Sequence, residues 1–184
     1  MNKKVALRIV LCALIALWLG FIWHNSAENG NETVETSNGV TQIVAGIVVP
    51  GYGGLPQEEK TAVIEKISPS VRSLAHASEF FVLALLVGAL VCTFAFKSVF
   101  LKQISITLTA CVLCSCADEI HQYFVPGRTS DILDILVDVA GALVGCGILI
   151  AAAVCKNKKA KIAFFILFTI IIRCFFSSFN IMRM

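Results

Sequence analysis

Ionisable side chains recur at helical spacing in two places where the sequence turns strongly apolar. Arg72, His76 and Glu79 stand at offsets of four and seven residues, so they would share one face of a helix. A second set has offsets of three and seven and consists of Asp131, Asp134 and Asp138. A charge inside a membrane-spanning helix costs about 2.5–3.5 kcal/mol on insertion scales, so such groups usually mark a functional site.

A third polar segment lies between these two sets. The residues in it that could take part in chemistry are Asp118, Glu119, His121, Gln122 and Arg128. Pro126 and Gly127 within it break a helix. The connection is short, so the apolar runs on its two sides should be antiparallel neighbours. The three polar sets are therefore expected to meet at one end of a helical bundle.

Histidine and arginine define the chemistry that such a meeting point could support. His76 or His121 could act as a general base, because imidazole titrates near neutrality. Arg72 and Arg128 could hold a phosphate or carboxylate through bidentate hydrogen bonds. The acids could orient the histidines or bind a divalent cation. No nucleophile elbow, phosphate loop or H-E-x-x-H zinc motif is present, so we predict no metal site and leave the cofactor open.

Composition identifies the surroundings of these residues as a lipid bilayer. Of 184 residues, 58% are hydrophobic and 15% charged, and the mean hydropathy is +0.85. These values exclude a soluble globular domain, a disordered chain and a disulfide-rich secreted protein. A net charge of +3 gives no support to nucleic-acid binding. We predict an all-α, polytopic transmembrane bundle with spans at residues 5–23, 74–96, 99–117 and 132–154 and a fifth at 162–179.

The distribution of charge predicts the orientation of the chain. Nine of the fifteen Lys and Arg residues fall at one end of the predicted spans, and none of the twelve Asp and Glu residues does. Because basic residues concentrate in cytoplasmic loops, the N-terminus is expected in the cytoplasm and the polar site outside. Residues 1–154 then form the membrane domain, and residues 155–184 form a basic cytoplasmic loop followed by the fifth span.

Residues 24–73 become an exterior loop in this topology. Its first part, 25–39, is polar and is interpreted as turn-prone, and residues 42–49 are apolar but too short to span. Residues 57–67 have the pattern of a short amphipathic helix. Such a helix could lie on the membrane surface or pack on the bundle as a solvated element.

A purely structural role remains an alternative for the polar residues. Arg72 and Arg128 could neutralise carboxylates and hold three helices in register as an ion-pair network. The acidic stripe near residue 138 continues as Gly141 and Gly145, a G-x-x-x-G spacing that lets another helix approach closely. The eight cysteines lie in or beside apolar spans and are interpreted as packing residues.

Two blocks of sequence resemble the VanZ-like family of bacterial membrane proteins, which is named for a teicoplanin-resistance protein. The first block is Arg72-Ser73-Leu74-Ala75-His76-Ala77-Ser78-Glu79-Phe80-Phe81. The second is Asp118-Glu119-Ile120-His121-Gln122-Tyr123-Phe124-Val125-Pro126-Gly127-Arg128, followed by Asp131, Asp134, Asp138 and Gly141. The resemblance extends from the first predicted span through the fourth. It implies a bacterial cell-membrane protein from a family associated with low-level resistance to a lipoglycopeptide antibiotic.

Two functions fit these observations. In the first, a charged pocket at the outer face binds an envelope lipid, a lipid-linked cell-wall precursor or a glycopeptide antibiotic, and its binding residues are Arg72, Gln122, Arg128, Asp131, Asp134 and Asp138. In the alternative, the protein is an enzyme that modifies a lipid or lipid-linked precursor by acid–base chemistry, and its catalytic candidates are His76, Glu79, Asp118, Glu119 and His121.

Overall fold

The computed structural model describes residues 2–27, 30–94, 100–128 and 131–154, and the secondary-structure elements within them are all helices. The α-helices are α1 (Lys3–Ala27), α2 (Gly30–Val48), α3 (Gln57–Cys92), α4 (Phe100–Tyr123) and α5 (Ile132–Val154), with a short 3-10 helix η1 (Tyr52–Gly54) before α3. The predicted basic loop and fifth span at 155–184 lie outside the described residues.

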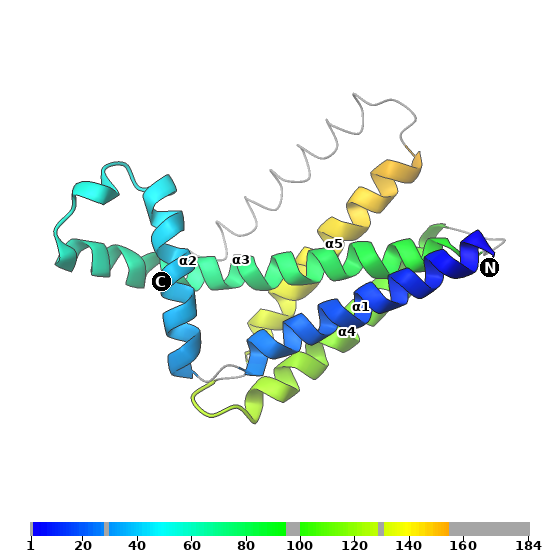
Figure 1. Cartoon of the computed structure of the whole chain (residues 1–184), viewed down its shortest axis with the longest axis horizontal. Helices are drawn as coiled ribbons and strands as arrows, with labels where there is room; N and C mark the ends of the chain where they lie inside the picture. Colours follow the sequence, from blue (N-terminus) through cyan, green and yellow to red (C-terminus); the bar gives the residue numbers. More distant parts are fainter. Residues whose placement is uncertain (1, 28–29, 95–99, 129–130, 155–184) are drawn as a thin grey trace.

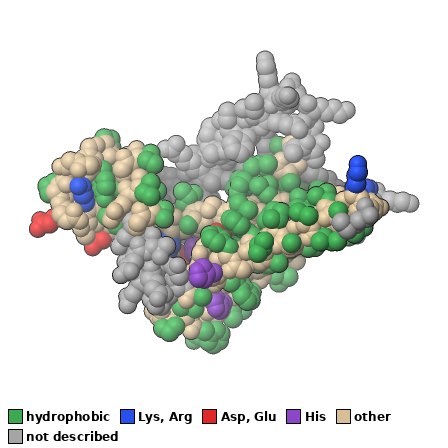
Figure 2. Space-filling model, in the orientation of Figure 1, with side chains coloured by type: hydrophobic (Ala, Val, Ile, Leu, Met, Phe, Trp, Pro, Cys, Tyr) green, Lys and Arg blue, Asp and Glu red, His purple; other side chains and the backbone are tan. Residues whose placement is uncertain are grey.

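Four of these helices are long and apolar enough to cross a membrane: α1, α3, α4 and α5. Many of their large apolar side chains face away from the protein, including Leu17 on α1 and Leu101 on α4, which are 72% and 69% exposed. Figure 2 shows hydrophobic side chains over much of the visible face of the bundle. An apolar surface of this kind is stable only against lipid. The predicted fold class, an all-α membrane bundle, is confirmed.

Helix α3 is the centre of the arrangement and contacts each of the other four α-helices. Figure 1 shows α1 and α4 running beside it, while α5 crosses it. The core contains Ile22 of α1, Phe80 and Leu83 of α3, Cys111 of α4 and Cys146 of α5. All four spanning helices therefore share one apolar core, and their ends are held at fixed positions around it.

Glycines bring α3 and α5 into close contact. A Cβ atom on Gly141 would lie 2.0 Å from the carbonyl oxygen of Ala77, and one on Gly145 would lie 2.8 Å from that of Phe81. On the opposing helix, a Cβ on Gly88 would lie 2.2 Å from Leu149. The backbones touch at a separation that no larger residue allows. The close approach predicted from the G-x-x-x-G spacing is confirmed.

The structure corrects the interpretation of residues 25–39 as a turn-prone segment. Helix α1 continues to Ala27, and α2 begins at Gly30. Polar composition lowers helix propensity only weakly, and contacts with α3 supply what propensity lacks. The first proline after α1 is Pro50, which lies just beyond the end of α2.

The amphipathic stretch at residues 57–67 is the beginning of α3, and it is continuous with the span that follows. Helix α3 has 36 residues, so it is about 54 Å long, against about 30 Å for the hydrocarbon core. It therefore extends well beyond the bilayer. Likewise α4 runs to Tyr123, although the apolar run was predicted to end at residue 117. Hydropathy marks the part of a helix that lies in lipid, whereas the helix ends where its backbone bonding ends.

Candidate functional site

The end of α1 is joined to α4 by a buried hydrogen-bonded cluster. The Ser26 hydroxyl donates to Asp118 Oδ1 at 2.6 Å, and Gln122 Nε2 donates to Asp118 Oδ2 at 2.7 Å. None of the three side chains is more than 2% exposed. The offset of four residues between Asp118 and Gln122 places both on one face of α4, where the amide and the hydroxyl satisfy both carboxylate oxygens.

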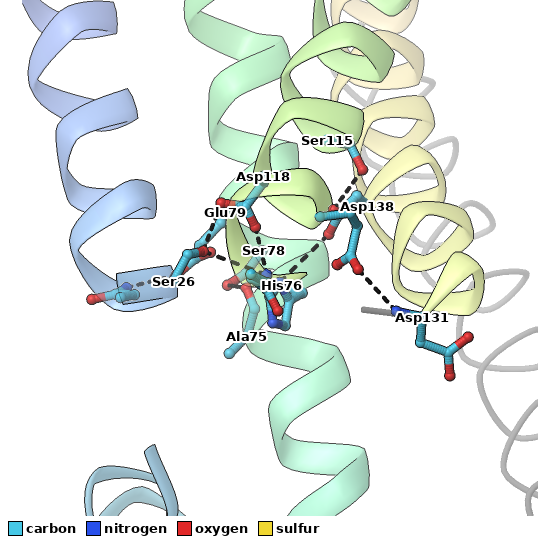
Figure 3. A network of polar contacts seen from close by, with 12 residues as sticks. Ser26, Ala75, His76, Ser78, Glu79, Ser115, Asp118, Asp131 and Asp138 are labelled. Atoms are coloured by element: carbon cyan, nitrogen blue, oxygen red, sulfur yellow. Dashed lines mark hydrogen bonds and ion pairs between the residues drawn. The ribbon is translucent and has the colours of Figure 1, made fainter. Parts of the chain in front are cut away.

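A second polar group links α3, α4 and α5. The Ser115 hydroxyl donates to Asp138 Oδ2 at 2.7 Å, and Asp138 Oδ1 lies 3.8 Å from His76 Nδ1. Figure 3 shows His76 between the Ser26–Asp118 pair and the Ser115–Asp138 pair. The Asp138 side chain is fully buried, whereas that of His76 is 11% exposed. The carboxylate therefore lies behind the imidazole, at a distance longer than a hydrogen bond.

Two further contacts hold α4 and α5 at their connection. The backbone N–H of Asp131 donates to Glu119 Oε2 at 2.9 Å, and Asp131 Oδ1 accepts the N–H of Leu133. Asp131 thus caps the first turn of α5. Glu119 of α4 is therefore bonded to the residue that precedes α5. Arg128 follows α4, and its Nη2 donates to the carbonyl of Asn25 at 3.3 Å.

Helix α1 also contacts Glu79 of α3. Asn25 Nδ2 donates to Glu79 Oε1 at 2.8 Å, and the Trp18 indole N–H donates to the Glu79 carbonyl at 2.9 Å. Both donors lie on the side of α1 that faces α3. Glu79 is thereby held in place with one of its two carboxylate oxygens engaged by an amide.

These elements border an open cavity of about 720 Å³. Its polar lining residues are Asn25, Ser26, Arg72, His76, Ser78, Glu79 and Arg128. Its apolar lining residues are Trp18, Phe21, Val40, Val71, Ala75, Phe81 and Val82. The volume lies in the range of small-molecule sites. The lining combines cations and hydrogen-bonding groups with aromatic surface, which is the combination that an amphiphile requires.

The structure separates the sequence candidates into three groups. Arg72, His76, Glu79 and Arg128 line the cavity. The second group lies behind it in buried positions, namely Asp118, Glu119, Gln122 and Asp138. The third group lies elsewhere at this end of the bundle: Asp131 caps α5, Asp134 lies half-buried in its first turn, and the ring of His121 stacks on that of Trp23 at 5.8 Å between centroids.

Several residues of the site were not identified from sequence, namely Trp18, Ser26, Ser78 and Ser115. Ser115 had a usable signal, because it precedes Asp118 by three residues and so lies on the same face of α4. The role of Trp18 required knowledge of which helix α1 packs against. Within the described ranges, no group of three or more His, Cys, Asp or Glu side chains is arranged to hold a metal ion.

Comparison with known proteins identifies the family. The VanZ/LLP1 family model matches residues 11–156, which includes all of the cavity and the buried network behind it. No curated protein and no solved structure matches the chain. The family match covers most of the chain, and four helices are suited to cross a membrane. The chain is a multi-pass membrane protein that belongs to the VanZ/LLP1 family.

Proposed function

We propose that the protein binds an anionic amphiphile of the cell envelope, either a phospholipid or a lipid-linked cell-wall precursor, in the cavity between α1 and α3. The observation that supports this most directly is the pair of arginines, Arg72 and Arg128, in the lining of a cavity that aromatic residues also line. The proposal includes the topology deduced from charge, with the N-terminus in the cytoplasm and the cavity at the outer face.

The arginines are the proposed phosphate ligands. Guanidinium groups present paired N–H donors that match two phosphate oxygens. Arg72 is exposed, and the part of the chain that the structure describes offers it no carboxylate within ion-pair distance. Asn25 and Ser26 supply further polar groups to the lining. A phosphate in this position would be held by two charges and flanked by amide and hydroxyl groups.

The apolar residues of the lining are the proposed contacts of the hydrocarbon chain. Phe21, Phe81 and Val82 contribute apolar surface to the cavity. Phe21 is itself 47% exposed on a span that faces lipid. An acyl or prenyl chain could therefore leave the cavity directly into the bilayer without crossing water.

Binding of this kind would have a physiological consequence for the action of glycopeptide antibiotics. VanZ-like proteins are associated with low-level teicoplanin resistance, and a bound cell-wall precursor would be less accessible to the drug. A lipoglycopeptide is itself an amphiphile, so direct capture of the antibiotic would use the same cavity. Binding tests with purified precursor and antibiotic as separate ligands distinguish the two sources.

The test is a binding measurement on the purified full-length protein. Native mass spectrometry would count bound phosphatidylglycerol or lipid-linked precursor on wild type, Arg72→Gln and the control Lys66→Gln. Lys66 is exposed on the outer part of α3 and lies outside the cavity lining, so its replacement removes an equal charge without changing the proposed site. Hydrogen bonds to charged groups contribute about 1.5–3 kcal/mol, so Arg72→Gln should weaken binding about tenfold or more. Equal binding by all three proteins would refute the proposal.

An enzymatic function is the second candidate, and it is favoured by the pairing of His76 with Asp138. His76 lines the cavity while Asp138 stands behind its Nδ1 atom, which leaves Nε2 as the nitrogen able to exchange a proton with a ligand. Replacement by asparagine at position 76 separates the two functions. A binder should retain its ligand after His76→Asn, whereas an enzyme should retain the ligand but lose a product detectable by mass spectrometry of envelope lipids.

A further inference from the structure

The second half of α2 combines an apolar surface with a complete lack of charge. Between Glu35 and Glu58 the sequence contains no Asp, Glu, Lys or Arg. Residues Gly39–Val48 form an apolar helical stretch that is too short to cross a bilayer. A segment of this length and composition is buried in protein or lies at a membrane interface.

The exposure of the side chains in residues 39–48 excludes burial of this stretch in the protein. Ile43 and Ile47 stand one turn apart and are 67% and 80% exposed, and Val40 on the same side is 51% exposed. Thr41 and Ala45, on the opposite side of the helix, are fully buried. Helix α2 therefore attaches to α3 through small residues and directs its largest apolar side chains away from the bundle.

The direction of α2 places it along the membrane surface. Figure 1 shows α2 running across the bundle, near the end of α1. Since α1 and α3 are membrane-spanning helices, an element that crosses them at their outer end lies close to the membrane plane. Exposed Phe21 and Trp23 mark the same end of α1 as a lipid-facing surface, and aromatic rings of this kind concentrate at the interface.

We propose that residues 39–48 form an interfacial helix whose apolar face, Val40, Ile43 and Ile47, inserts among the lipid chains of the outer leaflet. Lipid is the occupant that fits, because the face is uncharged and continues the lipid-facing surface of the bundle. A protein partner would have to displace lipid from a helix that already lies at the level of the membrane interface. The interfacial geometry is typical of amphipathic helices that rest at the headgroup boundary.

This placement determines how the cavity is reached. Val40 belongs both to the apolar face of α2 and to the wall of the cavity. An amphiphile would therefore enter sideways from the outer leaflet, passing α2 without leaving the membrane. This second step rests on the proposed function, whereas the insertion of α2 does not depend on any ligand.

Tryptophan substitution with two quenchers tests the insertion. Ile43→Trp, Ile47→Trp and the control Gln42→Trp would be reconstituted at full length into nanodiscs, with wild type giving the contribution of Trp18 and Trp23. Gln42 adjoins Ile43 but points to a different side of the helix, because neighbouring residues are separated by about 100°. One set of discs contains lipids brominated on the acyl chains, and aqueous iodide is added to the other.

Insertion predicts that acyl-chain bromine removes most of the added emission of Ile43→Trp and Ile47→Trp, while iodide has little effect on either. Gln42→Trp should show the reverse pattern. Iodide quenching of all three variants to the same degree would overturn the proposal. Because two positions report independently, misfolding of one variant does not leave the question open. Acyl-chain quenching at Ile43→Trp and Ile47→Trp would support insertion of α2 whatever the effect of Arg72→Gln on lipid binding. If Arg72→Gln weakens lipid binding but α2 is not quenched by acyl-chain bromine, the insertion proposal fails while the proposed function stands.

Discussion

Two successive stretches of α5 meet α3 in different ways. Near the start of the helix, Asp138 lies 3.8 Å from His76 Nδ1 and accepts a hydrogen bond from Ser115. In the middle of the helix, Gly141 and Gly145 bring the backbone of α5 against that of α3, with no space for a side chain. One helix thus uses a polar, incompletely bonded contact in one stretch and a close steric contact in the next.

The difference indicates that stability and chemistry are supplied by separate stretches of the same helix. The glycine contact is made by backbone atoms, so it has a single geometry and fixes the crossing of the two helices. The polar contact retains unused hydrogen-bonding capacity, because His76 Nδ1 and Asp138 Oδ1 are buried without a hydrogen-bond partner among the described residues. A buried polar atom without a partner lowers stability, so its presence points to a functional requirement.

The largest effect is expected from Gly141→Ala. Its Cβ would lie 2.0 Å from the carbonyl oxygen of Ala77, and backbone cannot move aside as a side chain can. Helices α3 and α5 would be forced apart, so we expect little folded protein to be recovered from the membrane. Size-exclusion chromatography of a fluorescent fusion in detergent would measure this.

A matched control is available at Gly20 of α1, where an added Cβ would meet no atom within 4 Å. Alanine is favoured over glycine in a helix by about 1 kcal/mol, so Gly20→Ala should leave recovery unchanged or slightly improved. Normal recovery of Gly141→Ala would show that the glycine contact does not determine the packing of α5.

An intermediate effect is expected from Asp118→Ala in the buried cluster between α1 and α4. The substitution leaves the Ser26 hydroxyl and the Gln122 amide buried without their acceptor. The expected loss in unfolding free energy is about 1–3 kcal/mol, since buried donors without acceptors pay their full desolvation penalty. Thermal unfolding in detergent would show a lowered midpoint, with Asp118→Asn between alanine and wild type because its amide keeps one acceptor oxygen. Identical midpoints for both variants and wild type would show that this cluster does not hold α1 to α4.

Sequence reasoning succeeded where one helix contained the whole signal. The stripe of Asp131, Asp134 and Asp138 and its continuation through Gly141 and Gly145 could be identified from spacing alone, and the close approach at the glycines is present. Periodicity reports which residues share a face, and an apolar environment makes an ionisable face expensive unless it points inward.

Contacts between helices far apart in sequence could not be predicted in this way. Nothing local to Trp18 indicates that its indole donates to the carbonyl of Glu79, because that contact depends on the relative rotation of α1 and α3. Similarly, the helical state of residues 30–48 depends on packing against α3, which outweighs the polar composition that suggested turns. The polar stripes were therefore predictable, while their partners on other helices were not.

The smallest effect is expected from Arg8→Gln, at the end of the bundle opposite the cavity. Arg8 joins α1 to the end of α3 by donating to the Thr93 hydroxyl and carbonyl at 3.0 and 2.9 Å, with its guanidinium 4.0 Å from the centroid of the Phe94 ring. These contacts are only partly buried, so water can replace them, and we expect a loss of about 0.5–1.5 kcal/mol in unfolding free energy. Lys4→Gln removes the same charge from the exposed start of α1 and serves as the control in thermal unfolding.

The same variant sharpens the contrast between the two ends of the bundle. Arg8 lies at the opposite end of α1 from Asn25 and Ser26 and does not line the cavity. Arg8→Gln should therefore lower the unfolding midpoint slightly while lipid binding, measured by native mass spectrometry, stays at the wild-type level. Arg72→Gln should give the reverse result, with normal stability and weakened binding, because its guanidinium is exposed and faces the cavity. If both variants weakened binding equally, the arginines would act through the stability of the bundle, and the separation of stability from ligand binding would fail.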